Sequence, residues 1–257
     1  METEDIFKKI SGLNMSGLIL LAARSGMGKT SFALNMARTV AEEKTAAVFS
    51  MEMSREQVSA RLLALAPPAE NKRTCSGTIY IDDNPALSVA DIHAKCCQLD
   101  NLGLVVIDYL QLMTWNRGGE NRCQQAVEIS RMLKIMSKEL NVPVLCLSQL
   151  SRVVEEREDK RPVLSDLRGS GPFVPEADIV LFLYQGCYYH EKMKKSDMME
   201  CIVAKNVYGE SGTVELRWRP KGNRFLVSDN MCCWQRQAMR RYIPGACLLV
   251  ADAPKPP

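Results

Sequence analysis

The sequence predicts an α/β fold, in which a mainly parallel, twisted β-sheet is flanked by helices and ends in an antiparallel hairpin at one edge. The first observation is that short apolar runs alternate with helical patterns over most of the chain, as in sheets whose crossovers are helices. The second is that these runs are apolar along their whole length, which indicates strands covered on both faces. The third is that the last runs follow each other without a helix, which favours a hairpin.

Eight strands are expected in chain order, at 18–22, 46–51, 78–82, 103–108, 143–148, 178–184, 200–205 and 213–218. Four helices are expected between the early strands, near 29–42, 54–66, 88–100 and 122–140. The first helix carries Phe32, Met36 and Val40 at four-residue spacing, which is the spacing of one apolar helix face. The second helix follows Ser54-Arg55-Glu56-Gln57, a capping-box pattern that starts a helix.

The bulk composition fits an ordinary globular protein. The chain has 257 residues, of which 46% are hydrophobic and 25% charged, enough for one large domain or two small ones. We expect one domain over residues 1–227 and a tail of unknown structure over 228–257, where the strand and helix patterns end. A net charge of +3 is too small to indicate a nucleic-acid partner by itself.

The sequence also predicts a reducing compartment and no membrane. The N-terminus, METEDIFKK, lacks the basic-then-apolar order of a signal peptide, and no stretch reaches the roughly 18 apolar residues of a membrane span. We therefore expect a cytoplasmic protein. Its ten cysteines are then expected as reduced thiols, and with no C-x-x-C and only two histidines a zinc site is not expected.

A glycine-containing loop joins the first strand to the first helix. Residues 23–30 fit the P-loop pattern, except that Ala23 stands where the pattern has its first glycine. Small residues there let backbone N–H groups wrap phosphates, and the helix that opens at Lys29 adds its positive end. Lys29 is expected at the β- and γ-phosphates of a nucleotide, and the Thr30 hydroxyl at Mg²⁺. The predicted nucleotide-binding set is Ala23, Arg24, Ser25, Gly26, Met27, Gly28, Lys29, Thr30 and Ser31.

Polar residues also end three other predicted strands. Asp108 ends an apolar run and is, with Thr30, the candidate for holding the Mg²⁺ shell. Glu52 follows the strand at 46–51 and is a candidate for orienting or deprotonating water, close to the loop if the two strands are neighbours. Gln149 ends the strand at 143–148 and is a candidate sensor of the γ-phosphate. The alternative for Glu52 and Gln149 is an ordinary solvated residue at a strand end.

These residues stand in a series of motifs that resembles the C-terminal RecA-like motor domain of DnaB-type replicative DNA helicases. The resemblance covers about residues 10–227 and rests on AARSGMGKTSFALNMA, FSMEMSREQVSARLLA, YIDDNPALSV, LVVIDYLQLM, ENRCQQ, EISRMLKIMSKELNVPVLCLSQLSR, DKRPVLSDLRGSG and ADIVLFLY. It implies a RecA-like P-loop NTPase fold, ATP and Mg²⁺ between the subunits of a ring hexamer, single-stranded DNA in its centre and 5′–3′ unwinding. By position it implies that Lys29 and Thr30 bind nucleotide and metal, that Glu52 is the catalytic carboxylate, and that Asp108 is the Walker B acid. Gln149 becomes the residue that couples the γ-phosphate to DNA.

The DNA contacts are expected in loops, because ring motors hold a single strand by its phosphates. One polar loop, at 114–122, carries arginines that suit this role. A second candidate is the turn Asp-Leu-Arg-Gly-Ser-Gly, which contacts the DNA backbone in the resembled family. The loop at 151–162 mixes basic and acidic residues, so a solvated surface is the alternative there. The predicted DNA-binding residues are Arg117, Arg122, Arg168, Gly169 and Gly171.

The chain departs from the family's pattern in three ways. It begins almost at the motor core, without the primase-binding domain or the linker helix between subunits, so we expect a weakened hexamer. The segment 64–78 is also shorter than in the family. The family's hairpin offers a lysine and an arginine to the neighbour's γ-phosphate; here Lys205 is kept but Val207 replaces the arginine. Two residues apart on one strand, the two side chains would face the same way.

Because a trans arginine is worth about 10³–10⁵ in rate, the valine predicts slowed hydrolysis unless Arg217 or Arg219 substitutes. Three functions therefore stay open. The first is an ATP- and Mg²⁺-dependent helicase motor domain that binds single-stranded DNA as a homo-oligomer. The second is a catalytically weak paralogue that binds nucleotide and joins or modulates another helicase's ring. The third is a RecA-type recombination ATPase, which the wording of the motifs disfavours.

Overall fold

The computed structural model describes residues 16–65, 77–108, 122–170, 175–189, 197–219 and 224–227. These residues belong to one compact unit, Met1–Val227, whereas all of the second unit, Ser228–Pro257, lies outside the described residues. The expected tail at 228–257 therefore stays a prediction. Among the described helices, none is long and apolar enough to cross a membrane.

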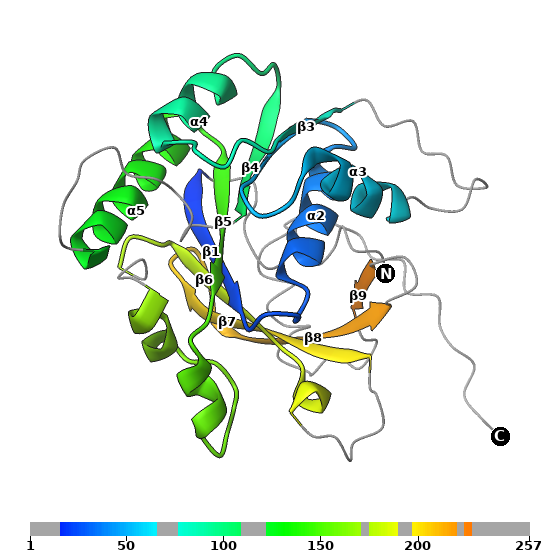
Figure 1. Cartoon of the computed structure of the whole chain (residues 1–257), viewed down its shortest axis with the longest axis vertical. Helices are drawn as coiled ribbons and strands as arrows, with labels where there is room; N and C mark the ends of the chain where they lie inside the picture. Colours follow the sequence, from blue (N-terminus) through cyan, green and yellow to red (C-terminus); the bar gives the residue numbers. More distant parts are fainter. Residues whose placement is uncertain are drawn as a thin grey trace. The chain divides into compact units, whose positions relative to one another are not determined.

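One sheet organises the described residues, with its nine strands in the order β3-β2-β4-β5-β1-β6-β7-β8-β9 (Figure 1). The first six strands in this order are parallel: β3 (Ile79–Asp82), β2 (Thr45–Ser50), β4 (Leu102–Asp108), β5 (Pro143–Gln149), β1 (Gly17–Ala23) and β6 (Ile179–Tyr184). The last three are antiparallel: β7 (Met198–Asn206), β8 (Gly212–Arg219) and β9 (Arg224–Val227). The predicted mainly parallel sheet with an antiparallel edge is confirmed.

Helices cover both faces of the parallel part (Figure 1). One face carries α2 (Lys29–Val40) and α3 (Arg55–Ala64), and the other carries α4 (Val89–Cys96) and α5 (Arg122–Glu139). Along β1, Ile19 and Leu21 belong to the first core, while Leu18 and Leu20 belong to the second. Successive side chains of a strand point to opposite faces, so a strand buried on both faces is apolar throughout, as expected from the apolar runs in the sequence.

The helices begin where their sequence signals place them. The Ser54 hydroxyl accepts a hydrogen bond from the Gln57 N–H at 3.4 Å, and the Gln57 side chain accepts one from the Ser54 N–H at 3.1 Å. This reciprocal pair is the predicted capping box of α3. Phe32 and Met36 of α2 are fully buried, and Val40 packs against the same core. The last predicted helix turn is missing from α4, which ends at Cys96 and not near residue 100.

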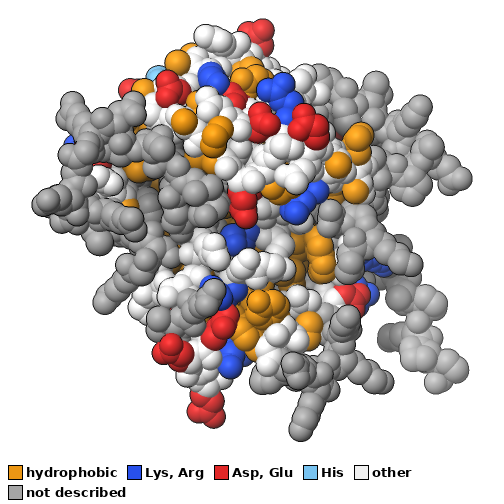
Figure 2. Space-filling view, in the orientation of Figure 1, with side chains coloured by type: hydrophobic (Ala, Val, Ile, Leu, Met, Phe, Trp, Pro, Cys, Tyr) orange, Lys and Arg blue, Asp and Glu red, His pale blue; other side chains and the backbone are white. Residues whose placement is uncertain are grey.

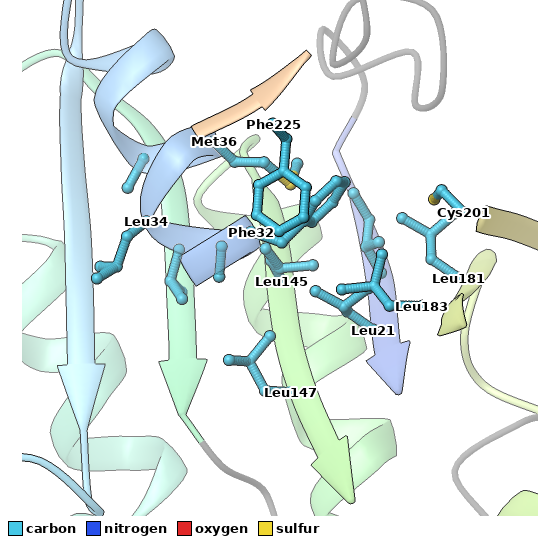
Figure 3. Packing of buried hydrophobic residues seen from close by; sticks show 14 of the residues in the cluster. Leu21, Phe32, Leu34, Met36, Leu145, Leu147, Leu181, Leu183, Cys201 and Phe225 are labelled. Atoms are coloured by element: carbon cyan, nitrogen blue, oxygen red, sulfur yellow. The ribbon is translucent and has the colours of Figure 1, made fainter. Parts of the chain in front are cut away.

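Strand β9 was not predicted. It is four residues long and follows β8 closely, so it offers little pattern of its own. Its Phe225 is fully buried and meets the Phe32 ring edge-on, with 5.2 Å between centroids (Figure 3). Trp218 of β8 packs on the Phe225 ring, with 4.4 Å between the ring centroids. The antiparallel edge therefore folds over the start of α2 and adds to the core beside it.

Charges of both signs lie among one another on the described part of the face shown in Figure 2. This agrees with the small net charge of +3. A field of one sign is what draws nucleic acid from a distance. The net charge therefore does not by itself indicate a nucleic-acid partner.

Candidate active site

The loop after β1 has the backbone shape that a phosphate site needs. Gly26 and Gly28 both have φ near +80°, a left-handed conformation that glycine adopts without strain. Gly28 is also the N-cap of α2, and a Cβ there would stand 3.4 Å from the Phe225 ring. Gly28 offers no side-chain cap to this end of α2, so the N-cap does not satisfy the first N–H groups of the helix, which have no partner within the helix. A helix N-terminus of this kind attracts anions.

Three predicted residues meet at this loop. Thr30, in the first turn of α2, donates its hydroxyl to an Asp108 carboxylate oxygen at 2.7 Å. Asp108 ends β4 and is 3% exposed. The Lys29 ammonium donates to the Ala23 carbonyl at 3.2 Å, so the lysine side chain folds back over the loop. The structure thus brings together the residues predicted to bind phosphate and metal.

Burial and mutual charge shift both ionisable groups. Burial lowers the pKa of Lys29, an effect opposed by the negative charges of Asp108 and Glu52. Burial likewise raises the pKa of Asp108, and the nearby Glu52 raises it further, against the Thr30 hydrogen bond and the charges of Lys29 and Arg61. Such opposed shifts between neighbouring groups are typical of functional sites. A buried carboxylate of this kind gains from a bound cation.

Glu52 and Gln149 also reach this edge of the sheet, though by different routes. Strands β2 and β1 are not neighbours, since β4 and β5 lie between them. The register of β2 nevertheless pairs Ser50 with Asp108. The exposed Glu52 follows Ser50 closely in the chain and therefore lies just beyond the buried aspartate. Gln149 pairs with Ala23, directly before the loop, and is exposed. Both therefore lie at the same ends of the strands as the loop.

Lys205 and Val207 lie at the opposite ends of the strands from the phosphate loop. Lys205 pairs with Val180 near the start of β6, whereas the phosphate loop lies at the edge where β6 ends. Its ammonium donates to the Pro175 carbonyl at 3.1 Å. The condition that Val207 shares a strand with Lys205 is not met, because β7 ends at Asn206 and Val207 is 62% exposed in the following turn. These side chains are too far along the sheet to serve the loop of their own chain.

The two arginines that were considered as substitutes are on β8, and they do not replace Val207 in position. Arg217 pairs with Met198 at the start of β7, and Arg219 follows it. Since β7 runs antiparallel to β6, its start lies at the edge of the phosphate loop. Arg217 and Arg219 therefore lie at the opposite edge from Lys205.

The predicted DNA-binding residues are only partly described. Arg117 and Gly171 lie outside the described residues. Arg122 is the first residue of α5, and Arg168 and Gly169 belong to the 3-10 turn η4 (Leu164–Ser170), but only their backbone is described. The segments that lead to α5 and η4 leave the carboxyl ends of β4 and β5, on the edge that carries Asp108 and Gln149.

Sequence reasoning placed Arg24 in the loop but missed its contacts, and it missed two further side chains around the loop, Arg61 and Tyr188. The Arg24 guanidinium is buried and bound to the segment after β5, a contact that local pattern cannot show. Arg61 of α3 is close enough to Asp108 to lower its pKa. Tyr188, in the short turn η5 (Gly186–Tyr188), lies against the loop, where a Cβ on Gly26 would be 3.9 Å from its ring. A run of tyrosines after a predicted strand was the available signal for Tyr188.

A parallel sheet with a glycine loop and a strand-end carboxylate at one edge defines the P-loop class, here with a RecA-like order of strands. Within that class, the chain belongs to the family of DnaB-like helicase C terminal domains, whose model matches residues 2–78 and 68–227. The family expected from the motifs is thereby confirmed.

Curated relatives include replicative DNA helicases. The chain is 44% identical over 248 residues to the replicative DNA helicase DnaB of Geobacillus stearothermophilus, and 42% identical to the replicative DNA helicase DnaC of Bacillus subtilis. Each comparison covers 86% of this chain and 55% of the relative. The chain therefore spans about half the length of the curated relatives it matches.

Solved structures agree with this assignment. One solved ATPase domain matches with a TM-score of 0.76 and 34% identity, covering 83% of this chain and 85% of that one. A DnaB-like replicative helicase, solved to show its interactions with primase, matches with a TM-score of 0.75 and 34% identity over 83% of this chain and 58% of its own. The RadB recombinase matches with a TM-score of 0.55 at 17% identity, covering 82% of this chain and 90% of its own, which shows the fold alone.

Proposed function

We propose that this chain is the ATP-hydrolysing motor domain of a replicative DNA helicase, acting in the cytoplasm. It binds ATP with Mg²⁺ at the loop after β1, binds single-stranded DNA, and couples hydrolysis to movement along the DNA. The observation that supports this most is the meeting of Lys29, Thr30 and Asp108 at one sheet edge, in a chain of the DnaB-like helicase family.

The donor set suits Mg²⁺, which prefers hard oxygen ligands. The Thr30 hydroxyl and an Asp108 oxygen lie 2.7 Å apart, and the carboxylate is buried beside a lysine. When bound, the ion neutralises charge on the phosphates. Thr30 and Asp108 would hold it, and the Lys29 ammonium would move from the Ala23 carbonyl to the β- and γ-phosphates.

The remaining residues at this edge have chemical roles that follow from their place. Glu52 is exposed, carries a negative charge and lies in range of Lys29, so it can orient a water and take its proton. Gln149 is exposed at the mouth of the loop and offers an amide to the γ-phosphate. Its strand leads on to η4, so the same strand serves both the nucleotide and the proposed DNA turn.

The position of Lys205 favours a site shared between subunits of a homo-oligomer. It lies at the sheet edge opposite its own phosphate loop, so a phosphate contact requires a second copy of the chain. Charge from such a neighbour would stabilise the transferring phosphoryl group.

Val207 is the observation that favours a second candidate function. An exposed valine in the turn after β7 can offer no charge to a neighbour's phosphate. The alternative is therefore a catalytically weak paralogue that binds nucleotide and modulates another helicase's ring.

Turnover and binding together test the proposal. ATP hydrolysis is measured with and without single-stranded DNA, at protein concentrations that span assembly. Lys29→Ala should weaken the binding of an ATP analogue, because it removes a cation that meets the phosphates. Glu52→Gln should still bind the analogue but hydrolyse ATP about 10²–10⁴ times more slowly, because it loses the base.

The matched control is Glu56→Gln, an exposed glutamate in the first turn of α3. It should hydrolyse ATP like the parent. Parent-like hydrolysis by Glu52→Gln would refute the role of Glu52. A parent that binds ATP but shows no turnover at any concentration, with or without DNA, would establish the weak paralogue instead.

DNA binding is tested by its salt dependence. Affinity that comes from phosphate contacts falls steeply with salt and depends little on sequence. Arg168→Ala should lower the slope of log affinity against log salt by about one unit. Strong sequence selectivity or a salt-independent affinity would contradict the proposed contact with the DNA backbone.

A further inference from the structure

The side chain of Arg24 reaches from the phosphate loop to the segment that follows β5. Its Nη1 donates to the Leu150 carbonyl at 2.7 Å, and its Nε donates to a Glu155 carboxylate oxygen at 2.7 Å. The residue is 8% exposed. A guanidinium buried to this degree is stable only while it stays paired. The loop and the segment after β5 are therefore constrained to keep this relation.

The peptide of Leu150 is held from both sides by the loop. Its N–H donates to the Ala23 carbonyl at 3.1 Å, and its carbonyl accepts from Arg24. The Ala23 carbonyl also accepts from the Lys29 ammonium at 3.2 Å. A phosphate that takes the ammonium leaves Leu150 as the donor to that carbonyl. Nucleotide bound at the loop would thus change the hydrogen bonding of Leu150, the residue that directly follows Gln149.

A second ion pair continues the connection. Two residues after Glu155, the Arg157 Nη2 donates to an Asp166 carboxylate oxygen at 2.9 Å. The same oxygen accepts from the Val163 N–H at 2.7 Å, so Asp166 holds the first turn of η4. Arg157 also donates to the Arg161 carbonyl at 2.7 Å, which closes the intervening loop.

Apolar packing also holds the segment 150–170 against one core. Val154, in the 3-10 turn η3 (Arg152–Glu156), and Leu167 of η4 are both fully buried in the same core as Leu150. Tyr189 feels the charges of this pair: burial, and after it the negative charge of Glu155, raises the pKa of Tyr189 to about 12, against the positive charge of Arg24. The mixed charges at 151–162 are in part internal pairs and not simply a solvated surface.

We infer that Glu155 is a positioning residue: with Arg24 it ties the segment 150–170 to the phosphate loop, and through Arg157 and Asp166 it passes the state of that loop to η4. The inference rests on the proposed function, since it takes nucleotide to bind at the loop and DNA to bind at η4. It adds the physical link between them.

The test compares Glu155→Gln with Glu156→Gln, which removes the same charge from the exposed neighbouring residue. The first readout is the ratio of single-stranded DNA affinities with and without a non-hydrolysable ATP analogue. The second is amide hydrogen exchange of peptides that cover 150–170, with and without the analogue. The Glu155 side chain is 37% exposed, so its loss should leave the fold intact. Analogue affinity and thermal melting are measured for every variant to check this.

In the parent and in Glu156→Gln, the analogue should change the DNA affinity and protect the 150–170 amides. Glu155→Gln should bind the analogue within about threefold of the parent but lose at least about fivefold of the affinity ratio, the lower end of typical coupling between sites. Its 150–170 amides should no longer respond to the analogue. Asp166→Asn should keep the response before residue 157 and lose it in 164–170.

Three results would decide against the inference or its basis. If Glu155→Gln keeps both the ratio and the protection, or changes no more than Glu156→Gln, the inference is wrong while the proposed function stands. If the parent binds the analogue without any protection of 150–170, the inference is also wrong. If the parent does not bind the analogue, the proposed function fails, and the inference fails with it.

Discussion

Two aspartates end parallel strands on either side of β2, and they differ in how their charge is compensated. The register places them almost level, since Phe49 pairs with Asp82 and Ser50 pairs with Asp108. Both are buried, at 6% and 3% exposure. Burial alone would raise the pKa of Asp82, but hydrogen bonds from Lys95, the Asn84 N–H at 3.0 Å and Tyr80 hold it below its ordinary value.

Asp108 has the opposite balance. The Thr30 hydroxyl and the charge of Lys29 do not offset its burial and the nearby Glu52, so its pKa is raised. The chain satisfies Asp82 from its own residues, whereas Asp108 remains a buried carboxylate that a cation from outside would stabilise. The comparison teaches that the donors around a strand-end acid, and not its burial or its place, distinguish a structural residue from a candidate ligand.

The largest expected effect separates the two aspartates by activity. Asp108→Asn should lower ATP turnover at saturating ATP and Mg²⁺ by about 10²–10³, comparable to the loss of one charge-stabilising group. Asp82→Asn should change turnover per folded molecule by less than about threefold. Steady-state hydrolysis, normalised to the folded fraction by circular dichroism, measures both. Equal losses in the two variants would remove the distinction.

Adding a positive charge at position 207, where it would face the site of a neighbouring copy, should have the next largest effect. Val207→Arg should raise the ATPase activity of assembled protein by at least about tenfold, a small part of a trans arginine's usual effect. The exposed turn should accept the longer side chain. The gain should vanish on dilution below assembly and in a Glu52→Gln background.

The matched control for that substitution is Ile135→Arg, which also places an arginine at a half-exposed apolar position, on α5. It should leave the rate unchanged. An assembled Val207→Arg protein that is no faster than the parent would show that the turn does not reach a neighbour's phosphate.

Stability should change in the opposite order to activity. Asp82→Asn should lower the free energy of unfolding by about 1–2 kcal/mol, because charge-assisted hydrogen bonds are lost, and the one-third exposure of Lys95 limits the loss. Asp108→Asn should leave the ligand-free protein as stable as the parent or more so. Urea unfolding monitored by fluorescence measures both. A larger loss in Asp108→Asn would show that the chain itself compensates that carboxylate.

The smallest effect is a pH dependence. The pKa of Asp82 is lower in the folded chain than in the unfolded one, so its contribution to stability is present above the ordinary carboxyl value of about 4. It is lost as the pH falls through the folded value. The stability difference between the parent and Asp82→Asn should therefore be largest near pH 7 and shrink as the pH falls below about 4. A difference that grows on acidification would contradict the direction of the shift.

The sequence predicted most elements because their signals are local. An apolar run such as 103–108, or the capping box at Ser54, is visible within a few residues, and the structure places a strand and a helix there. Thr30 and Asp108 could also be paired in advance, because carboxyl ends of parallel strands share one edge.

What stayed hidden depends on contacts between distant residues. The order of strands separates β1 from β2, which no local pattern shows. The Arg24–Glu155 pair joins residues 131 positions apart. Asp82 and Asp108 both follow apolar runs, and only the donors around them tell them apart. Phe225 was missed because its strand is four residues long, although its ring closes the core over α2.

The opposite placement of Lys205 and the phosphate loop has a consequence for how copies of the chain add up. If each site is completed by the far edge of the next copy, the contact is head-to-tail, and a string of copies always has one unfinished site at its end. Two copies would then hold one complete site between them, and three would hold two. Only a closed ring gives every copy a complete site. The rate per chain should therefore continue to rise with the size of the assembly until the ring closes.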